Sequence, residues 1–186
     1  MLPNLAWCGD GCSNEDASAG AYYLAGYAQT TNHVRDVRDC GLDFIAQIWM
    51  SGSHRIFDDF QREGLWAVGL GDLPQRPKAG EAGVGHSWEN LEPRFGSMKE
   101  HPAIRMFDLI DEPSALDIPH YGEIIRKVQK KIRWAEPFIN LYPNYARLAA
   151  NSDDLTKSQL GTETYVEYLD RYARTVPLNY LSYDYY

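Results

Sequence analysis

The feature that most restricts the fold of this chain is a repeated alternation between two kinds of segment. Short apolar runs that end in polar residues alternate with segments whose apolar residues recur at helical spacing. Strands that alternate with helices in this way are typical of βαβ units and a parallel sheet. Six apolar runs are predicted strands, at residues 5–8, 42–49, 65–70, 104–110, 138–142 and 180–184.

Capping residues and glycines set the expected helix boundaries. Asn32 and Ser53 are candidate N-caps, and Gly41 and Gly64 follow the last residues of the same two helices. A third helix is predicted over about residues 119–135, where five apolar residues form one stripe: Tyr121, Ile124, Ile125, Val128 and Ile132. These signals predict helices between the successive strands.

The remaining intervals give weaker patterns. Helices are predicted at residues 19–28, at 91–98 before the stop at His101-Pro102, and at 163–175. In the last of these, the expected apolar face consists of Tyr165, Leu169, Tyr172 and Val176. Residues 74–85 hold two prolines and three glycines, which predicts a loop.

Two architectures accommodate six strand–helix units: an open doubly wound sheet and a (β/α)8 barrel. Nucleotide-binding open sheets carry a glycine-rich turn after an early strand, and Gly9-Asp10-Gly11 is too short to form one. The sequence therefore favours an α/β fold, a partial TIM (β/α)8 barrel that occupies residues 1–186 as one incomplete domain. Closure needs about 250 residues. We expect a truncated chain, an incomplete gene or a partial barrel that self-associates through open edges; a complete six-stranded α/β protein is the alternative.

Composition excludes several functions. The net charge is −8 and no Lys/Arg run occurs, which argues against a nucleic-acid partner. No stretch approaches the roughly 20 apolar residues that cross a membrane. The N-terminus lacks a signal core, so we expect a cytoplasmic protein, or a secreted or periplasmic one whose signal was removed. Three cysteines at unrelated spacing predict neither a complete disulfide framework nor a zinc site, and no cofactor is expected.

Polar and aromatic residues gather where the predicted strands end, which is where (β/α)8 barrels carry their working residues. The Asp111-Glu112-Pro113 turn follows the apolar run 106–110. Glycoside hydrolysis needs two carboxyl groups, one of which protonates the leaving oxygen. Burial at the strand end and the neighbouring Asp111 charge would keep a proton on Glu112, which makes Glu112 the candidate acid. Alternatively, both acidic residues cap the following helix.

Four segments resemble a family of clan A-like (β/α)8 glycoside hydrolases from polysaccharide-degrading organisms. They are 101–104 (HPAI), 109–114 (LIDEPS), 139–146 (INLYPNYA) and 181–186 (LSYDYY), in matching order and spacing. The resemblance implies that Glu112 is the acid/base of a retaining hydrolase that acts on O-glycosidic bonds of a poly- or oligosaccharide. It implies a nucleophile glutamate after a seventh strand, which this sequence lacks, so we expect this chain alone to be inactive. Asp111 stands where the clan usually has Asn.

Other strand-end residues are candidate sugar ligands: Asp111, Asn140, Asn144, Tyr145, Asp184, Tyr185, Asp72 and Trp49. A second hypothesis is a metal-dependent barrel enzyme such as a sugar isomerase, in which Asp72, Asp111, Glu112 and Asp184 hold a hard divalent cation. A third is a non-catalytic carbohydrate-binding subunit. A chelator should abolish the activity of the metal-dependent enzyme but not that of the hydrolase. The carbohydrate-binding subunit should bind sugar without turnover.

Overall fold

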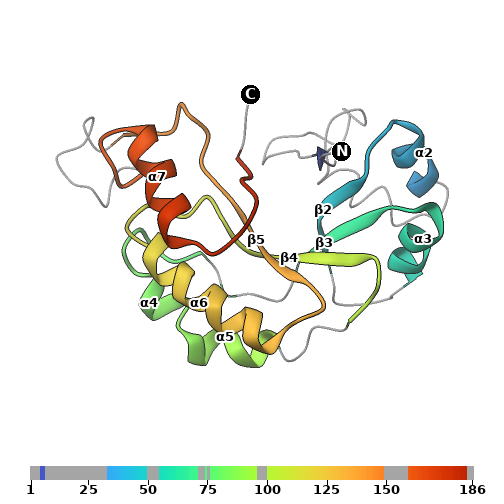
Figure 1. Cartoon of the computed structure of the whole chain (residues 1–186), viewed down its shortest axis with the longest axis horizontal. Helices are drawn as coiled ribbons and strands as arrows, with labels where there is room; N and C mark the ends of the chain where they lie inside the picture. Colours follow the sequence, from blue (N-terminus) through green and yellow to red (C-terminus); the bar gives the residue numbers. More distant parts are fainter. Residues whose placement is uncertain are drawn as a thin grey trace. The chain divides into compact units, whose positions relative to one another are not determined.

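The computed structural model describes residues 5–6, 33–49, 55–70, 74, 76–95, 100–148 and 159–183, and within them it is an α/β protein (Figure 1). Strands and helices alternate over most of this part of the chain, as the sequence predicts. In chain order the elements are β1 (Leu5–Ala6), α2 (His33–Asp39), β2 (Phe44–Trp49), α3 (Arg55–Glu63), β3 (Trp66–Leu70), α4 (Ala82–Gly85), α5 (Trp88–Phe95), β4 (Ile104–Asp111), α6 (Ile118–Lys131), β5 (Glu136–Asn140) and α7 (Tyr165–Thr175). The helix predicted at residues 19–28 lies outside the described residues.

The strands follow one another in a single sheet in the order β1-β2-β3-β4-β5. Parallel pairing joins β1 to β2, β2 to β3, and β3 to β4, which confirms the predicted parallel sheet. The run predicted as a sixth strand forms only an isolated parallel bridge, between Leu141 and Tyr183. The described residues therefore contain five strands rather than the six predicted, and the finer prediction of a partial barrel is taken up below.

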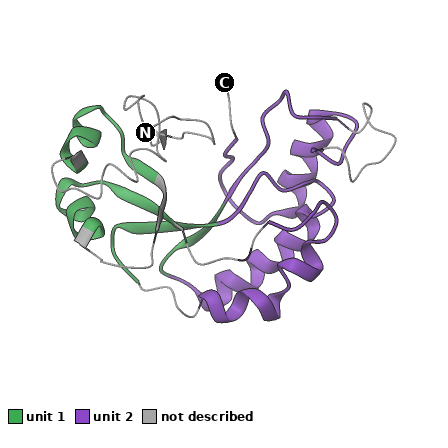
Figure 2. Cartoon of the chain, turned by 180° about the vertical axis from the view of Figure 1, so that it is seen from behind, with its two compact units in different colours: residues 1–72, 97–108, 134–138 green, residues 73–96, 109–133, 139–186 purple. Residues whose placement is uncertain are grey.

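The chain divides into two compact units, coloured separately in Figure 2. The first comprises residues 1–72, 97–108 and 134–138. Its helices α2 and α3 bury Val34, Val37, Phe57 and Phe60. As predicted, each helix is followed by a glycine with positive φ, Gly41 after α2 and Gly64 after α3.

The buried carboxylate of Glu63, in the first unit, is held in ion pairs. The Glu63 side chain is only 7% exposed, and its carboxylate receives Arg38 Nη1 at 2.9 Å and Arg35 Nη2 at 3.4 Å. His101 Nε2 lies 3.1 Å from Asp58 Oδ1, while its Nδ1 accepts the Ala103 N–H. His101 therefore shapes the turn before β4, which is the structural role that its place before Pro102 suggests.

In the second unit, residues 73–96, 109–133 and 139–186, the predicted stripe of α6 is confirmed. All five of its apolar residues are buried, and each fully buried Ile or Val contributes roughly 1.5–3 kcal/mol before conformational entropy is subtracted. Gly122 lets α6 approach the end of α7, because a Cβ at this position would lie 2.7 Å from the Thr175 carbonyl oxygen. The packing of α6 on α7 depends on that missing side chain.

Helix α7 begins at Tyr165, slightly later than predicted, and its buried face differs from the predicted one at a single position. Thr164 accepts the Glu167 N–H at 3.2 Å, and the Glu167 carboxylate accepts the Thr164 N–H at 3.1 Å, so a capping box starts the helix. Tyr168 is fully buried, whereas Leu169, which was predicted to face the core, is only partly buried. The predicted face is confirmed at Tyr172 and Val176, which are buried. Tyr168 takes the inner position expected of Leu169, and its hydroxyl donates to the Pro113 carbonyl at 2.9 Å.

The loop predicted at residues 74–85 contains one short helix, α4, and is fixed to α6. The Asp117 carboxylate accepts the N–H groups of Gly80 and Ala82 at 2.8 and 3.0 Å. His86 Nε2 lies 3.1 Å from the Pro74 carbonyl oxygen, and its Nδ1 lies 3.1 Å from the Tyr121 hydroxyl. The composition correctly predicts an irregular segment, but these tertiary bonds give it a fixed path.

None of the helices in the described ranges has the length and apolar character required to span a bilayer.

Candidate active site

The turn after β4 holds Glu112 in an unusual backbone conformation. Glu112 has φ +47°, and it is the only non-glycine residue with positive φ among the described residues. This conformation costs an L-residue about 1–2 kcal/mol. Hydrogen bonds on both sides fix it: the Glu112 N–H donates to the Asn140 carbonyl at 2.8 Å, and the Tyr168 hydroxyl donates to the Pro113 carbonyl at 2.9 Å. Strain retained against such a cost is characteristic of functional sites.

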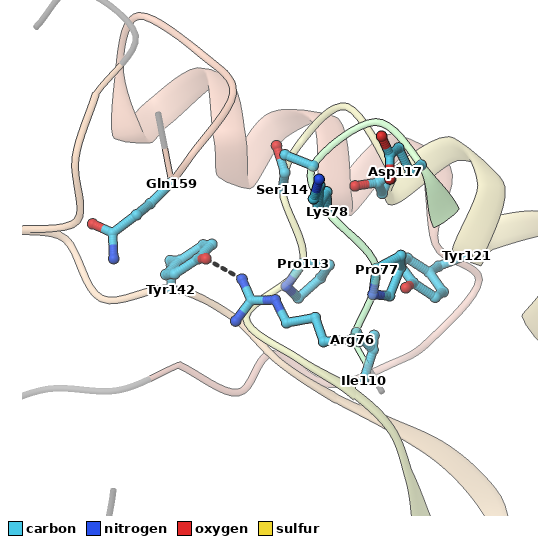
Figure 3. Close-up of a pocket in the computed structure, with 12 residues that line it drawn as sticks. Arg76, Pro77, Lys78, Ile110, Pro113, Ser114, Asp117, Tyr121, Tyr142 and Gln159 are labelled. Carbon is cyan, nitrogen blue, oxygen red and sulfur yellow. Dashed lines mark hydrogen bonds between the residues drawn. The ribbon is translucent and has the colours of Figure 1, made fainter. Parts of the chain in front are cut away.

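Arg76, from the loop after β3, binds this turn directly. Its Nη1 lies 3.6 Å from Glu112 Oε2. Its Nη2 donates to the Glu112 carbonyl oxygen and to the Tyr142 hydroxyl, a bond drawn in Figure 3. The Arg76 and Glu112 side chains are 40% and 26% exposed, so water screens the pair and its contribution is at most about 1 kcal/mol.

Tyr142 completes the group. The Arg76 guanidinium carbon lies 5.0 Å from the centre of the Tyr142 ring, within the range of a cation–π contact. Burial raises the pKa of Tyr142 above its ordinary value, and the Arg76 charge opposes this shift. Tyr142 therefore stays protonated at neutral pH. Because its oxygen already accepts from Arg76, its own hydrogen is available for a second bond.

A cavity of ≈ 430 Å³ lies beside these residues in the second unit (Figure 3). This volume is within the range of small-molecule sites. Glu112 is not one of the described lining residues, but it contacts Arg76, which lines the cavity. The described lining residues are Arg76, Pro77, Lys78, Ala79, Glu81, Ile110, Pro113, Ser114, Asp117, Tyr121, Tyr142 and Gln159.

Asp111 and Asn140 meet at the ends of β4 and β5, as their strand-end positions predict. Asn140 Nδ2 donates to Asp111 Oδ1 at 3.1 Å, and Asn140 Oδ1 accepts from Ser182 Oγ at 2.9 Å. Asn140 is 1% exposed. Both ends of its amide are thus occupied within the protein, and it connects two strand ends in the structure. Asn140 therefore stabilises the Asp111–Glu112 turn through its side chain and its carbonyl group.

The other predicted ligands are not brought to the cavity or cannot be placed. Asn144 and Tyr145 lie in a turn closed by the Ala146 N–H on the Pro143 carbonyl at 3.1 Å; both are exposed, and neither lines the cavity. Proline and asparagine are residues that favour such turns. Trp49 ends β2, and its side chain is outside what the structure describes. Asp72, Asp184 and Tyr185 lie outside the described residues.

Three site residues were not predicted from the sequence. Arg76 and Lys78 sit in a segment identified only as a loop, although loops after barrel strands are the usual position of functional groups. Tyr142 was assigned to the fifth strand. Since Tyr142 lies two residues after Asn140, the period of a strand would have placed the two on the same face. Nothing in the sequence indicates that Arg76 contacts Glu112.

No group of three or more His, Cys, Asp or Glu side chains within the described ranges is arranged to hold a metal ion. Two of the four carboxylates considered for a cation, Asp72 and Asp184, are not described. No protein-family model, curated protein or solved structure matches this chain.

Proposed function

We propose that this chain is part of a (β/α)8-barrel glycoside hydrolase, with Glu112 as its acid/base. The observation that carries the proposal is the left-handed backbone of Glu112 at the carboxyl-terminal end of a parallel strand, with Arg76 bound to it. Carboxyl-terminal strand ends carry catalysis in this architecture. The parallel order β1 to β4 and the bridge from Leu141 to Tyr183 are compatible with strands that continue around a barrel.

In the proposed reaction Glu112 acts twice. As an acid, it donates a proton to the glycosidic oxygen while the second carboxylate bonds to the anomeric carbon and the bond from that carbon to the glycosidic oxygen breaks. As a base, it removes a proton from the water that attacks the same carbon and displaces the second carboxylate. Arg76 contacts Glu112 in the absence of substrate, and a sugar hydroxyl that takes over the Arg76 contact would free the Glu112 carboxyl group to face the glycosidic oxygen. The second carboxylate is the glutamate that the resemblance implies after a seventh strand.

The test is hydrolysis of a panel of aryl glycosides by the complete barrel protein that the proposal implies, compared as wild type, Glu112→Gln and the control Glu123→Gln. Glu123 is exposed on α6, 2.7 Å from Arg126, and takes no part in the site. Loss of general acid–base catalysis should lower kcat about 10²–10⁴-fold in Glu112→Gln. The loss should be smaller for dinitrophenyl glycosides than for unsubstituted phenyl glycosides, because a stable leaving group needs no proton. Azide should restore activity only to Glu112→Gln.

Three results would contradict the proposal. Equal rates for wild type and Glu112→Gln would remove Glu112 from the mechanism. Sugar binding without turnover, unaffected by Glu112→Gln, would indicate a carbohydrate-binding subunit. Activity abolished by EDTA and restored by a divalent cation would indicate the metal-dependent alternative.

A further inference from the structure

The hydrogen-bond acceptors that line the cavity are mostly occupied within the protein. Both oxygens of the Asp117 carboxylate accept backbone N–H groups, at 2.8 and 3.0 Å. Gln159 Oε1 accepts the Arg147 N–H at 2.7 Å. The Tyr121 oxygen is paired with His86 Nδ1 at 3.1 Å. A ligand that offered mainly donors would therefore find few acceptors here.

The donors of the same lining are largely unused. Lys78 is exposed and forms no ion pair or hydrogen bond through its ammonium group with any described residue. With its oxygen bound to Arg147, Gln159 directs its amide nitrogen toward Tyr142 (Figure 3). The hydroxyl hydrogens of Tyr142 and Ser114 are also available. These donors come from four separated places in the chain, residues 78, 114, 142 and 159, and line one cavity.

Two cations and two anions line the cavity, but they are not equivalent. The Asp117 carboxylate keeps its charge, but both of its oxygens accept backbone N–H groups. Arg76 already contacts Glu112 and Tyr142, whereas Lys78 has an ammonium group without a partner among the described residues. Glu81 is an exposed carboxylate of the same lining, with its side chain in water. The chemistry of the cavity favours a ligand group that is rich in acceptors and negatively charged.

We propose that this cavity is a subsite for an anionic sugar, one that bears a carboxylate or a sulfate ester. The inference rests on the proposed hydrolase function and names its substrate class: an acidic polysaccharide. Arg76 and Lys78 contact the anionic substituent, while Gln159 and Ser114 donate to its remaining oxygens. Ile110 and Pro113 provide an apolar surface for the C–H face of the ring.

Binding of four trisaccharides to the purified chain tests the subsite by calorimetry, without requiring turnover. The probes are trigalacturonate, triglucuronate, a galactose 6-sulfate trisaccharide, and the trimethyl ester of trigalacturonate, which has the same shape without charge. We expect at least one anionic trisaccharide to bind about tenfold more tightly than the ester in low salt. The preference should shrink as NaCl is added, since exposed charges are screened. Which anionic probe binds distinguishes carboxylate from sulfate.

Two neighbouring substitutions should act in opposite directions on anionic probes only. Lys78→Gln should weaken their binding about two- to fivefold, and Glu81→Gln should strengthen it by a similar factor, as expected for exposed charges. The control Lys130→Gln, on the exposed face of α6, should change neither. Equal affinity for the ester and the anionic probes, or no binding of any probe, would overturn the subsite. If neutral aryl glycosides are hydrolysed but anionic probes bind no more tightly than the ester, the hydrolase proposal stands and only the subsite fails. If anionic probes bind preferentially but no glycoside is hydrolysed, the subsite stands and the hydrolase proposal fails.

Discussion

Replacing Glu112 with glycine should give a more stable protein than replacing it with alanine. The residue has φ +47°, where the Cβ of an L-residue crowds the backbone and costs about 1–2 kcal/mol. Alanine keeps that Cβ and glycine lacks it. Both substitutions remove the carboxylate and its 3.6 Å contact with Arg76, so the ion pair cancels from the comparison.

The unfolded state opposes this gain. Glycine has more backbone freedom than alanine, and folding it costs roughly 0.5–1 kcal/mol more. When this cost is subtracted from the relieved strain, the Glu112→Gly variant should be more stable than Glu112→Ala by about 0.5–1 kcal/mol. At an ordinary helical position the sign is reversed.

Urea unfolding of four variants measures the difference. Glu123, a solvent-exposed residue in the middle of α6, provides the control pair. At this position the alanine variant should be more stable than the glycine variant by about 1 kcal/mol. The prediction is that the order of the two variants is opposite at positions 112 and 123. If glycine is also the less stable variant at position 112, the turn stores no strain, and the principal support for placing a catalytic residue there is lost.

Two further predictions concern the second unit. Gly161→Ala should be less stable than Gly80→Ala by about 1–3 kcal/mol. Both glycines have positive φ, but a Cβ at 161 would lie 2.4 Å from Ser114 Oγ, whereas a Cβ at 80 would meet only Leu116 Cδ1 at 3.8 Å. Equal unfolding midpoints of the two variants in urea would contradict this prediction. Burial raises the pKa of Tyr172, so its neutral form contributes stability below the unfolded pKa of about 10 that is lost as the pH rises further. Thermal melts at about pH 9 to 12 should therefore show a smaller decline for Tyr172→Phe than for wild type, and parallel declines would show that the phenol does not contribute.

Features of the fold that depend on neighbours along the chain could be predicted from the sequence. The α6 stripe is an example, since the 3.6-residue period alone places Tyr121 and Ile125 on one side of the helix. Gly41 and Gly64 ended their helices because only glycine adopts positive φ without strain. The strand-end position of Glu112 followed in the same way, from an apolar run that stops at Asp111.

The arrangement around Glu112 was decided by tertiary structure. Arg76 is separated from Glu112 by 36 residues, and no local pattern indicates that its guanidinium binds the Glu112 turn and Tyr142. The path of the loop that carries Arg76 depends on Asp117. The Asp117 carboxylate fixes this loop by accepting the N–H groups of Ala82 and Gly80, which lie 35 and 37 positions away in the chain. Short-range periodicity determines which residues face inward, but contacts between distant segments form only when the packed elements bring them together. For that reason the sequence placed Glu112 at the end of a strand, and only the fold supplied its partners.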